Sequence, residues 1–311
     1  MPPSISIPLE SSKLRRLQFL AYALLFYTLL VIVWGAWVRI SHSGDGCGKS
    51  WPLCEGEFIP SQADHKTWIE YTHRLMSGFY GLLVIGLFLW IRKNFFSNKT
   101  LRFWSLSVLL LMTSEALLGA KLVLFGLVGT NDTFFRVLIM AFHQLNSFLL
   151  MGANLRLALV ASVPFEAGGE VVPSPFSKFK TWILGFFLIV AMTGAWASLS
   201  NTLYPSEGIL QGLMKDFSQD AHPLVRLRTL HPFLASLLCS FVIIYSWIKY
   251  LSSPQRRTLV VLLIFLFAFV LGWLTLFTLA PLGMKIAHLL MAHGLWLFFI
   301  NEVYGSSRRV E

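Results

Sequence analysis

Four histidines lie inside long apolar segments of this 311-residue sequence: His73, His143, His231 and His288. Ionisable side chains are costly inside a membrane span, so each is a functional hypothesis by default. Imidazoles from facing helices suit the axial ligation of an iron porphyrin, because the flat ring fills a slot between four helices. Zinc fits less well, since histidines that come in pairs offer too few ligands. A hydrogen bond to a carbonyl group explains any single histidine equally well, but four in matching positions favour the porphyrin.

A carboxylate accompanies one of these histidines. Glu70 precedes His73 by three residues, so both side chains lie on one face of a helix. The corresponding position before His231 holds Arg228 instead. A carboxylate beside a low-dielectric pocket can act as an acid or a base. The asymmetry is expected if one site performs proton chemistry and the other carries electrons. The alternative is that Glu70 forms an interfacial salt bridge with Arg74.

Basic residues near the four histidines could neutralise the propionates of a porphyrin. Arginine pairs with carboxylates through a rigid fork of donors. The alternative is that these long side chains only reach toward the membrane interface, and the sequence does not separate the two interpretations. The residues in question are Arg39, Arg74, Arg136, Arg226, Arg228 and Lys285.

The composition indicates that membrane-spanning helices position these residues. Apolar residues make up 56% of the chain and charged residues 13%, against about 45–50% and about 25% in soluble domains. This excludes a cytosolic globule, a disordered chain and a disulfide-rich secreted module. We predict an all-α integral membrane protein with eight transmembrane helices. Their approximate ranges are Leu17–Val38, Ile69–Ile91, Phe103–Val128, Val137–Val163, Thr181–Ser206, Leu230–Tyr250, Thr258–Met284 and Ile286–Ile300.

The distribution of Lys and Arg predicts how these helices are oriented. Placing the N-terminus inside puts the larger share of the basic residues on the cytoplasmic side, in agreement with the positive-inside rule. Both termini are then cytoplasmic, and the loop with Cys47 and Cys54 lies outside, where an oxidising compartment permits a disulfide. The same bias explains the net charge of +10, so we predict no nucleic-acid partner. We expect no cleaved signal or transit peptide.

An internal repeat divides the chain into two halves. The tripeptide Gly-Ala-Trp at 35–37 recurs at 194–196, and each copy is followed by a long loop with a proline and a helix with a histidine near its start. Self-similarity of this kind indicates two units of one design. We therefore predict two pseudo-symmetric four-helix bundles, residues 1–165 and 166–311, each with a cofactor site between its helices.

Several motifs together resemble the heme A synthases of aerobic bacteria and mitochondria. The resemblance extends over nearly the whole chain, and its most specific part is a loop with two cysteines followed by Glu-x-x-His. The motifs are Trp34-Gly35-Ala36-Trp37-Val38-Arg39, Gly44-Asp45-Gly46-Cys47-Gly48, Trp51-Pro52-Leu53-Cys54, Glu70-Tyr71-Thr72-His73-Arg74, and the helices with His143, His231-Pro232 and His288.

The resemblance implies an enzyme of the bacterial cytoplasmic (inner) membrane that oxidises a methyl group of heme O to the formyl group of heme A. In the N-terminal half, His73 and His143 would flank heme O, and Glu70 would be the catalytic carboxylate. The upstream partner would be heme O synthase, and the product would go to heme-copper oxidases. Besides these partners we expect contact with membrane lipid. The sequence does not decide whether the protein forms a homo-oligomer.

The resemblance also implies that the C-terminal half holds a resident heme B that passes electrons. Its ligands would be His231 and His288, although His293 offers a second candidate in the same span. Cys47 and Cys54 would form a disulfide over the N-terminal site. The sequence does not say whether that bond is structural or redox-active.

Other functions remain open at this point. A diheme membrane cytochrome for electron transfer explains the four histidines but gives Glu70 no task. A thiol–quinone oxidoreductase that uses Cys47 and Cys54 leaves the histidines idle, and a heme transporter or chaperone would need labile sites. Glu115 stands where the resemblance predicts a neutral polar residue, and neither it nor Lys121 is assigned a role.

Overall fold

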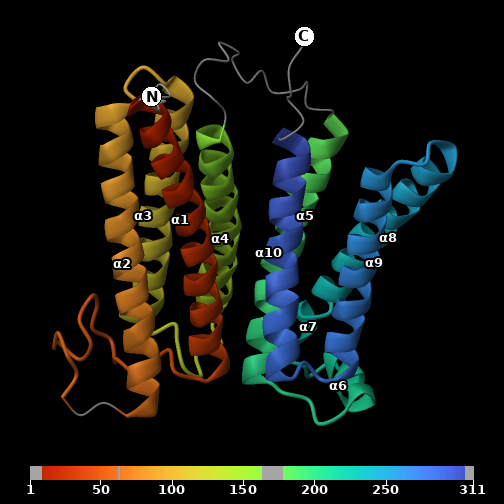
Figure 1. The fold of residues 1–311 in the computed structure, drawn as a ribbon. Coiled ribbons are helices and arrows are strands. Elements are labelled where there is room, and N and C mark those ends of the chain that lie inside the picture. The colour runs from red at the N-terminus through yellow and green to blue at the C-terminus, as the bar shows by residue number, and fades with distance from the viewer. Residues whose placement is uncertain (1–8, 62–63, 163–177, 305–311) are drawn as a thin grey trace, which may run out of the picture.

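The computed structural model describes residues 9–61, 64–162 and 178–304. In this part of the chain every regular element is an α-helix (Figure 1). The helices are α1 (Leu9–Ile40), α2 (His65–Asn94), α3 (Lys99–Leu124), α4 (Phe134–Ala161), α5 (Lys178–Leu203), α6 (Ile209–Asp216), α7 (Pro223–Leu227), α8 (Leu230–Ser252), α9 (Arg256–Phe277) and α10 (Leu282–Tyr304).

Eight of the segments in the described ranges are long and apolar enough to cross a bilayer. This confirms the predicted all-α membrane fold. Two short helices, α6 and α7, lie between α5 and α8 and were not predicted. Both are too short to produce the long apolar run from which the spans were recognised.

Polar residues fix where three of the spans begin. The side chains of Asp64, Asn98 and Thr133 each accept a hydrogen bond from the backbone amide three residues later, at 2.8, 2.9 and 3.4 Å. Such N-caps satisfy amides that have no partner within the helix. They fix the starts of α2, α3 and α4, and therefore the heights of His73 and His143 in the bundle.

The spans form two groups of four, α1–α4 and α5 with α8–α10 (Figure 1). Helix α4 packs on α1 and α3 within its own group and on α5 and α10 of the other group. Its residues Phe148 and Met151 share one hydrophobic core with Phe187 and Trp296. The predicted division at residue 165 falls within 163–177, outside the described residues. The pseudo-symmetry of the halves stays a prediction.

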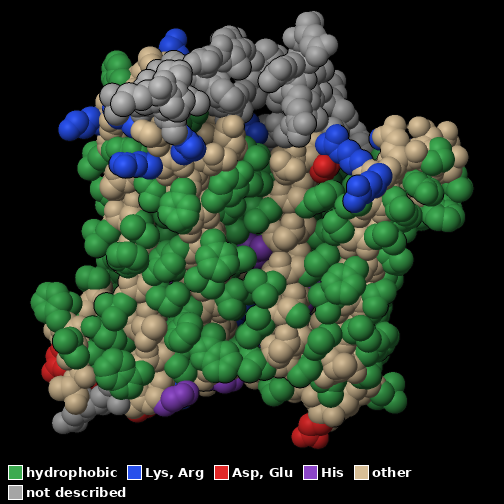
Figure 2. All heavy atoms as spheres, in the orientation of Figure 1, with side chains coloured by type: hydrophobic (Ala, Val, Ile, Leu, Met, Phe, Trp, Pro, Cys, Tyr) green, Lys and Arg blue, Asp and Glu red, His purple; other side chains and the backbone are tan. Residues whose placement is uncertain are grey.

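Basic side chains and hydrophobic side chains occupy different levels along the long axis of the helices. On the face drawn in Figure 2, hydrophobic side chains cover the middle, and Lys and Arg gather at the end where α1 begins and α10 ends. We call that end the terminal end and the opposite one, with segments 41–61 and 204–229, the loop end. A lipid-facing belt with basic residues at one end describes a multi-pass membrane protein. Which end faces the cytoplasm stays a prediction.

Single-cysteine labelling tests this orientation. We expect Asp220→Cys, at the loop end, to react with a membrane-impermeant maleimide in intact cells. Ser97→Cys, in the exposed turn before α3, should react only after permeabilisation. Labelling of Ser97→Cys alone in intact cells would reverse the orientation, and the permeabilised sample controls for the accessibility of both positions.

Candidate functional site

Each of the four histidines faces a glycine on the preceding span of its group. The closest contacts involve the first histidine of each group. A Cβ atom at Gly35 would come 2.9 Å from Cε1 of His73, and one at Gly194 would come 3.0 Å from Cε1 of His231. Real Cβ atoms hardly ever approach so closely, so a side chain at either glycine would displace the imidazole.

The second histidine of each group has a looser contact of the same kind. A Cβ atom at Gly119 would lie 3.9 Å from Cε1 of His143, and one at Gly272 would lie 3.5 Å from Cε1 of His288. A Cβ atom at Gly119 or Gly272 would therefore make an ordinary van der Waals contact, whereas Gly35 and Gly194 leave room that the imidazole rings of His73 and His231 occupy. All four histidines lie in the first few turns of helices that begin at the loop end.

In the C-terminal group, His231 and His288 face each other. Their ring centroids are 5.9 Å apart and their planes are almost perpendicular, at 84°. Nδ1 of His231 lies 3.1 Å from the carbonyl oxygen of Val190. A hydrogen bond donated from Nδ1 leaves Nε2 free to bind a metal.

The other candidate in the last span has a different environment. His293 is fully buried and stacks on Phe148, with ring centroids 4.2 Å apart. Its Nδ1 lies 3.0 Å from the carbonyl oxygen of Leu289 on its own helix. The geometry therefore brings His288, rather than His293, to His231.

In the N-terminal group, His73 on α2 packs against Gly35 of α1, and His143 on α4 packs against Gly119 of α3. Nδ1 of His73 is buried and has no hydrogen-bond partner among the described residues. Nδ1 of His143 lies 3.4 Å from the carboxylate of Glu115 on α3. Sequence reasoning had no basis for pairing Glu115 with His143, because the contact depends on how α3 packs on α4.

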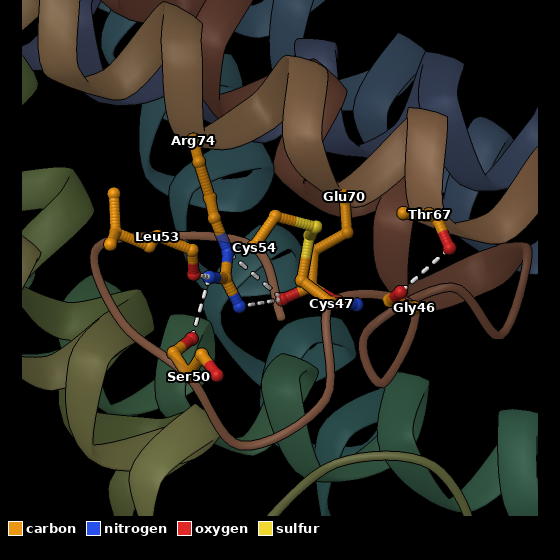
Figure 3. A network of polar contacts seen from close by, with 8 residues as sticks. All are labelled: Gly46, Cys47, Ser50, Leu53, Cys54, Thr67, Glu70 and Arg74. Carbon is orange, nitrogen blue, oxygen red and sulfur yellow. Dashed lines mark hydrogen bonds and ion pairs between the residues drawn. A yellow bond between two sulfur atoms is a disulfide. The ribbon is translucent and has the colours of Figure 1, made fainter. Parts of the chain in front are cut away.

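The carboxylate of Glu70 is buried and both its oxygens have partners (Figure 3). Oε2 accepts a hydrogen bond of 2.9 Å from the backbone amide of Cys47, and Oε1 lies 2.6 Å from Nη2 of Arg74. The ion pair that the sequence offered as an alternative is therefore present. It joins Glu70 to the cysteine loop as well as to its own helix.

The cysteine loop is attached to α2 at several further points. Cys47 and Cys54 form the predicted disulfide. Nη1 of Arg74 donates to the carbonyl oxygen of Ser50 at 2.6 Å and also to that of Leu53, and Oγ1 of Thr67 donates to Gly46 at 2.7 Å (Figure 3).

Gly46 has its own packing constraint. A Cβ atom there would lie 2.5 Å from the backbone of Lys66, so only glycine allows this close approach of loop and helix. Together these contacts hold the loop against α2 where Glu70 and His73 lie.

Arg228 holds the corresponding loop of the C-terminal group. Its guanidinium pairs with Asp216 at 2.6 Å and donates to Ser206 Oγ at 3.0 Å and to the carbonyl oxygen of Tyr204 at 3.1 Å. The sequence comparison of the two halves missed Asp216 because it lies on α6, outside the repeated spans. The C-terminal group thus also has a carboxylate near its loop, but α6 supplies it and the span does not.

Three basic residues lie at helix ends of the loop end: Arg39 in the last turn of α1, Arg136 in the first turn of α4 and Lys285 in the first turn of α10. Nε of Arg39 and Nε of Arg136 are buried and have no hydrogen-bond partner among the described residues. Nη1 of Arg136 donates to the carbonyl oxygens of Gly129 and Asn131, and Arg226 donates to those of Ser218 and Gln219. Buried guanidinium nitrogens without partners favour the binding of a carboxylate or another anion.

Comparison with known proteins gives the family. A family model described as "Cytochrome oxidase assembly protein" (COX15-CtaA) matches residues 18–300. The chain belongs to this family. The match covers all eight spans and both histidine pairs, so the site described above lies within the region that matches the family.

Individual relatives agree with that assignment. The chain is 35% identical over 306 residues to a "Protoheme IX farnesyltransferase" of Thermus thermophilus, in a match that covers 95% of this chain and 50% of the relative. It is 31% identical over 198 residues to a "Heme A synthase" of Exiguobacterium sibiricum, covering 62% of this chain and 63% of the relative. The chain therefore spans about half the length of the Thermus relative.

The histidine–glycine contacts predict a matched pair of stability effects. Gly194→Ala should lower the free energy of unfolding by about 1–3 kcal/mol, because the new methyl group overpacks His231. Gly185→Ala, on the same helix with nothing within 4 Å, should cause no loss. Chemical unfolding of both variants in detergent measures the difference. Equal stability would show that the ring of His231 moves aside freely.

Proposed function

We propose that this chain is a heme A synthase, which oxidises a methyl group of heme O to the formyl group of heme A with electrons relayed through a bound heme B. The observation that carries the proposal is the buried carboxylate of Glu70, held beside His73 under a disulfide-bonded loop. A protein of this family with two histidine pairs and one such carboxylate has the parts that the chemistry needs.

The residues fit a heme. The rings of His231 and His288 face each other with centroids 5.9 Å apart, so the two imidazoles would be able to hold a heme iron together. Gly35 and Gly194 leave space for the rings of His73 and His231. Among the described residues no three His, Cys, Asp or Glu side chains form a metal cluster. Two-histidine donor sets of this kind suit heme iron better than zinc.

In the N-terminal half, His73 and His143 would hold heme O as substrate. When it is bound, heme iron supplies the oxygen and electron chemistry. The chain's own contribution is to hold a proton-accepting carboxylate, Glu70, beside the pair and to exclude water. The loop between Cys47 and Cys54 is held against α2 by Arg74 and would exclude water from the site.

In the C-terminal half, His231 and His288 would hold heme B, and Val190 orients the first of them. Arg39 would bind heme propionates through its unpartnered Nε. Arg74 and Arg228 already bind loop atoms, so they would contribute positive charge near the propionates while keeping each loop in place. The two halves, residues 1–165 and 166–311, would thus hold substrate and electron relay separately.

The proposed partners follow from the relatives. The Thermus relative carries the name of a farnesyltransferase on a chain with a region similar to this one, which favours heme O synthase as the source of substrate. The family's description favours delivery to heme-copper oxidase assembly. We propose a bacterial cytoplasmic membrane location, with both termini cytoplasmic and the cysteine loop outside. The family match does not favour a diheme cytochrome or a thiol–quinone oxidoreductase.

Heme extraction from purified protein tests the reaction. Heme A should appear only when heme O synthase is co-expressed. With Glu70→Gln the rate of heme A formation should fall by about 10²–10⁴-fold, as for loss of a general acid or base, and heme O should accumulate. The proposal fails if the folded protein contains heme B alone under both conditions.

Glu57→Gln is the matched control. Glu57 lies in the same loop, where its carboxylate binds the exposed residue Ser61, so heme A formation should be unchanged. If both variants lose activity alike, attachment of the loop rather than the carboxylate of Glu70 is what matters.

A further inference from the structure

Glu115 has no role in the function proposed above, yet it is an acidic residue in the middle of a membrane span. Its carboxylate is turned toward α4, where three side chains contact it. Asn146 Nδ2 donates to Oε2 at 2.6 Å, and Ser147 Oγ donates to Oε1. Nδ1 of His143 lies 3.4 Å from Oε1. Positions 143, 146 and 147 share one face of α4, so Glu115 is fixed opposite that face.

The same stretch of α3 makes a second contact with the ring of His143. Gly119 follows Glu115 by one helical turn and therefore lies on the same face. A Cβ atom at Gly119 would lie 3.9 Å from Cε1 of the His143 ring. Gly119 thus lies beside the imidazole of His143, and Glu115 places a carboxylate oxygen 3.4 Å from its Nδ1.

The four histidines differ at this atom. Within the described part of the chain, Nδ1 of His231 faces the carbonyl oxygen of Val190. Nδ1 of His73, His143 and His288 makes no hydrogen bond to a described residue. Of these three atoms, Nδ1 of His143 has a described carboxylate at ion-pair distance, Oε1 of Glu115 at 3.4 Å. The difference is chemical, because a carboxylate carries a full negative charge and a carbonyl group only a dipole.

A carboxylate at Nδ1 changes what an imidazole does as a ligand. It holds the Nδ1–H tautomer, points Nε2 at the metal, and makes the ring a more basic donor. A more basic donor stabilises ferric over ferrous iron. Asn146 and Ser147 hold both carboxylate oxygens, so Glu115 cannot turn away from the ring.

We propose that Glu115 is a positioning residue for the substrate heme, and that it makes His143 the stronger donor of the His73–His143 pair. The inference rests on the proposed function in one respect, namely that these two histidines hold a heme. The carboxylate would set the orientation and donor strength of one of the two ligands. Nδ1 of the other ligand, His73, has no hydrogen-bond partner among the described residues.

Redox titration of the purified full chain carrying Glu70→Gln, in which heme O from co-expressed heme O synthase should accumulate, tests this proposal independently of turnover. Glu115→Gln keeps the size and the hydrogen-bonding capacity of the side chain but removes its charge. It should shift the midpoint potential of the N-terminal heme to a more positive value and change its low-spin EPR signal. The C-terminal heme should keep its potential and is the internal control.

Two further variants separate positioning from a merely structural role. Glu115→Asp retains the charge and should keep the potential closer to that of the natural protein than Glu115→Gln does. Glu115→Ala should also weaken retention of the N-terminal heme by about 10–100-fold, the usual cost of losing a partner behind a metal ligand. In a His143→Ala background, Glu115→Gln should cause no additional shift.

The outcomes distinguish this inference from the proposed function. An N-terminal heme with an unchanged potential in Glu115→Gln overturns the role of Glu115 and leaves the heme A synthase proposal intact. If Glu115→Gln shifts the midpoint potential but the natural protein makes no heme A, the positioning role is supported and the synthase proposal is overturned. Failure of the N-terminal pair to hold any heme overturns both.

Discussion

Glu70 can be buried at the loop end only because Arg74 and the backbone amide of Cys47 bind its two oxygens. A carboxylate removed from water without such partners would be strongly destabilising. The same arginine also binds the cysteine loop. One set of contacts therefore fixes the carboxylate of Glu70, the cysteine loop over the site and the start of α2. A change to any of them is transmitted to His73, one turn further along the helix.

The C-terminal group meets the same requirement with different residues. Arg228 binds the second loop and pairs with Asp216, which comes from α6. In both groups one arginine near the start of a histidine-bearing span holds a loop over the site and needs an acidic partner. What differs is where the acid lies. In the first group it lies on the span beside the histidine, and in the second it lies in the loop. The proposed division into proton chemistry in one half and electron transfer in the other agrees with this difference.

The sequence predicted the spans, and drew attention to the histidines within them, because both signals are local. An apolar run of sufficient length is visible without knowledge of its neighbours, and an ionisable residue within one, such as His143, stands out. The partner of Glu115 could not be predicted in this way, since Asn146 lies 31 residues away and meets it only through the packing of α3 on α4. Nothing in the sequence marks Gly119 and Gly272 as neighbours of His143 and His288, because that contact depends on helix packing. Asp216 lies in a segment without periodicity or repeat.

Helix α4 packs against both groups, and this has a consequence for biosynthesis. When the first four spans have entered the bilayer, the face of α4 that bears Phe148 and Met151 still lacks its partners from the second group. Its partners on α5 arrive next, but Trp296 belongs to α10, the last span to be inserted. The core between the groups can therefore be completed only after synthesis of the chain is nearly finished. A truncation that removes α10 would leave both histidine pairs in an incomplete scaffold, since His288 is lost and α4 lacks its last neighbour.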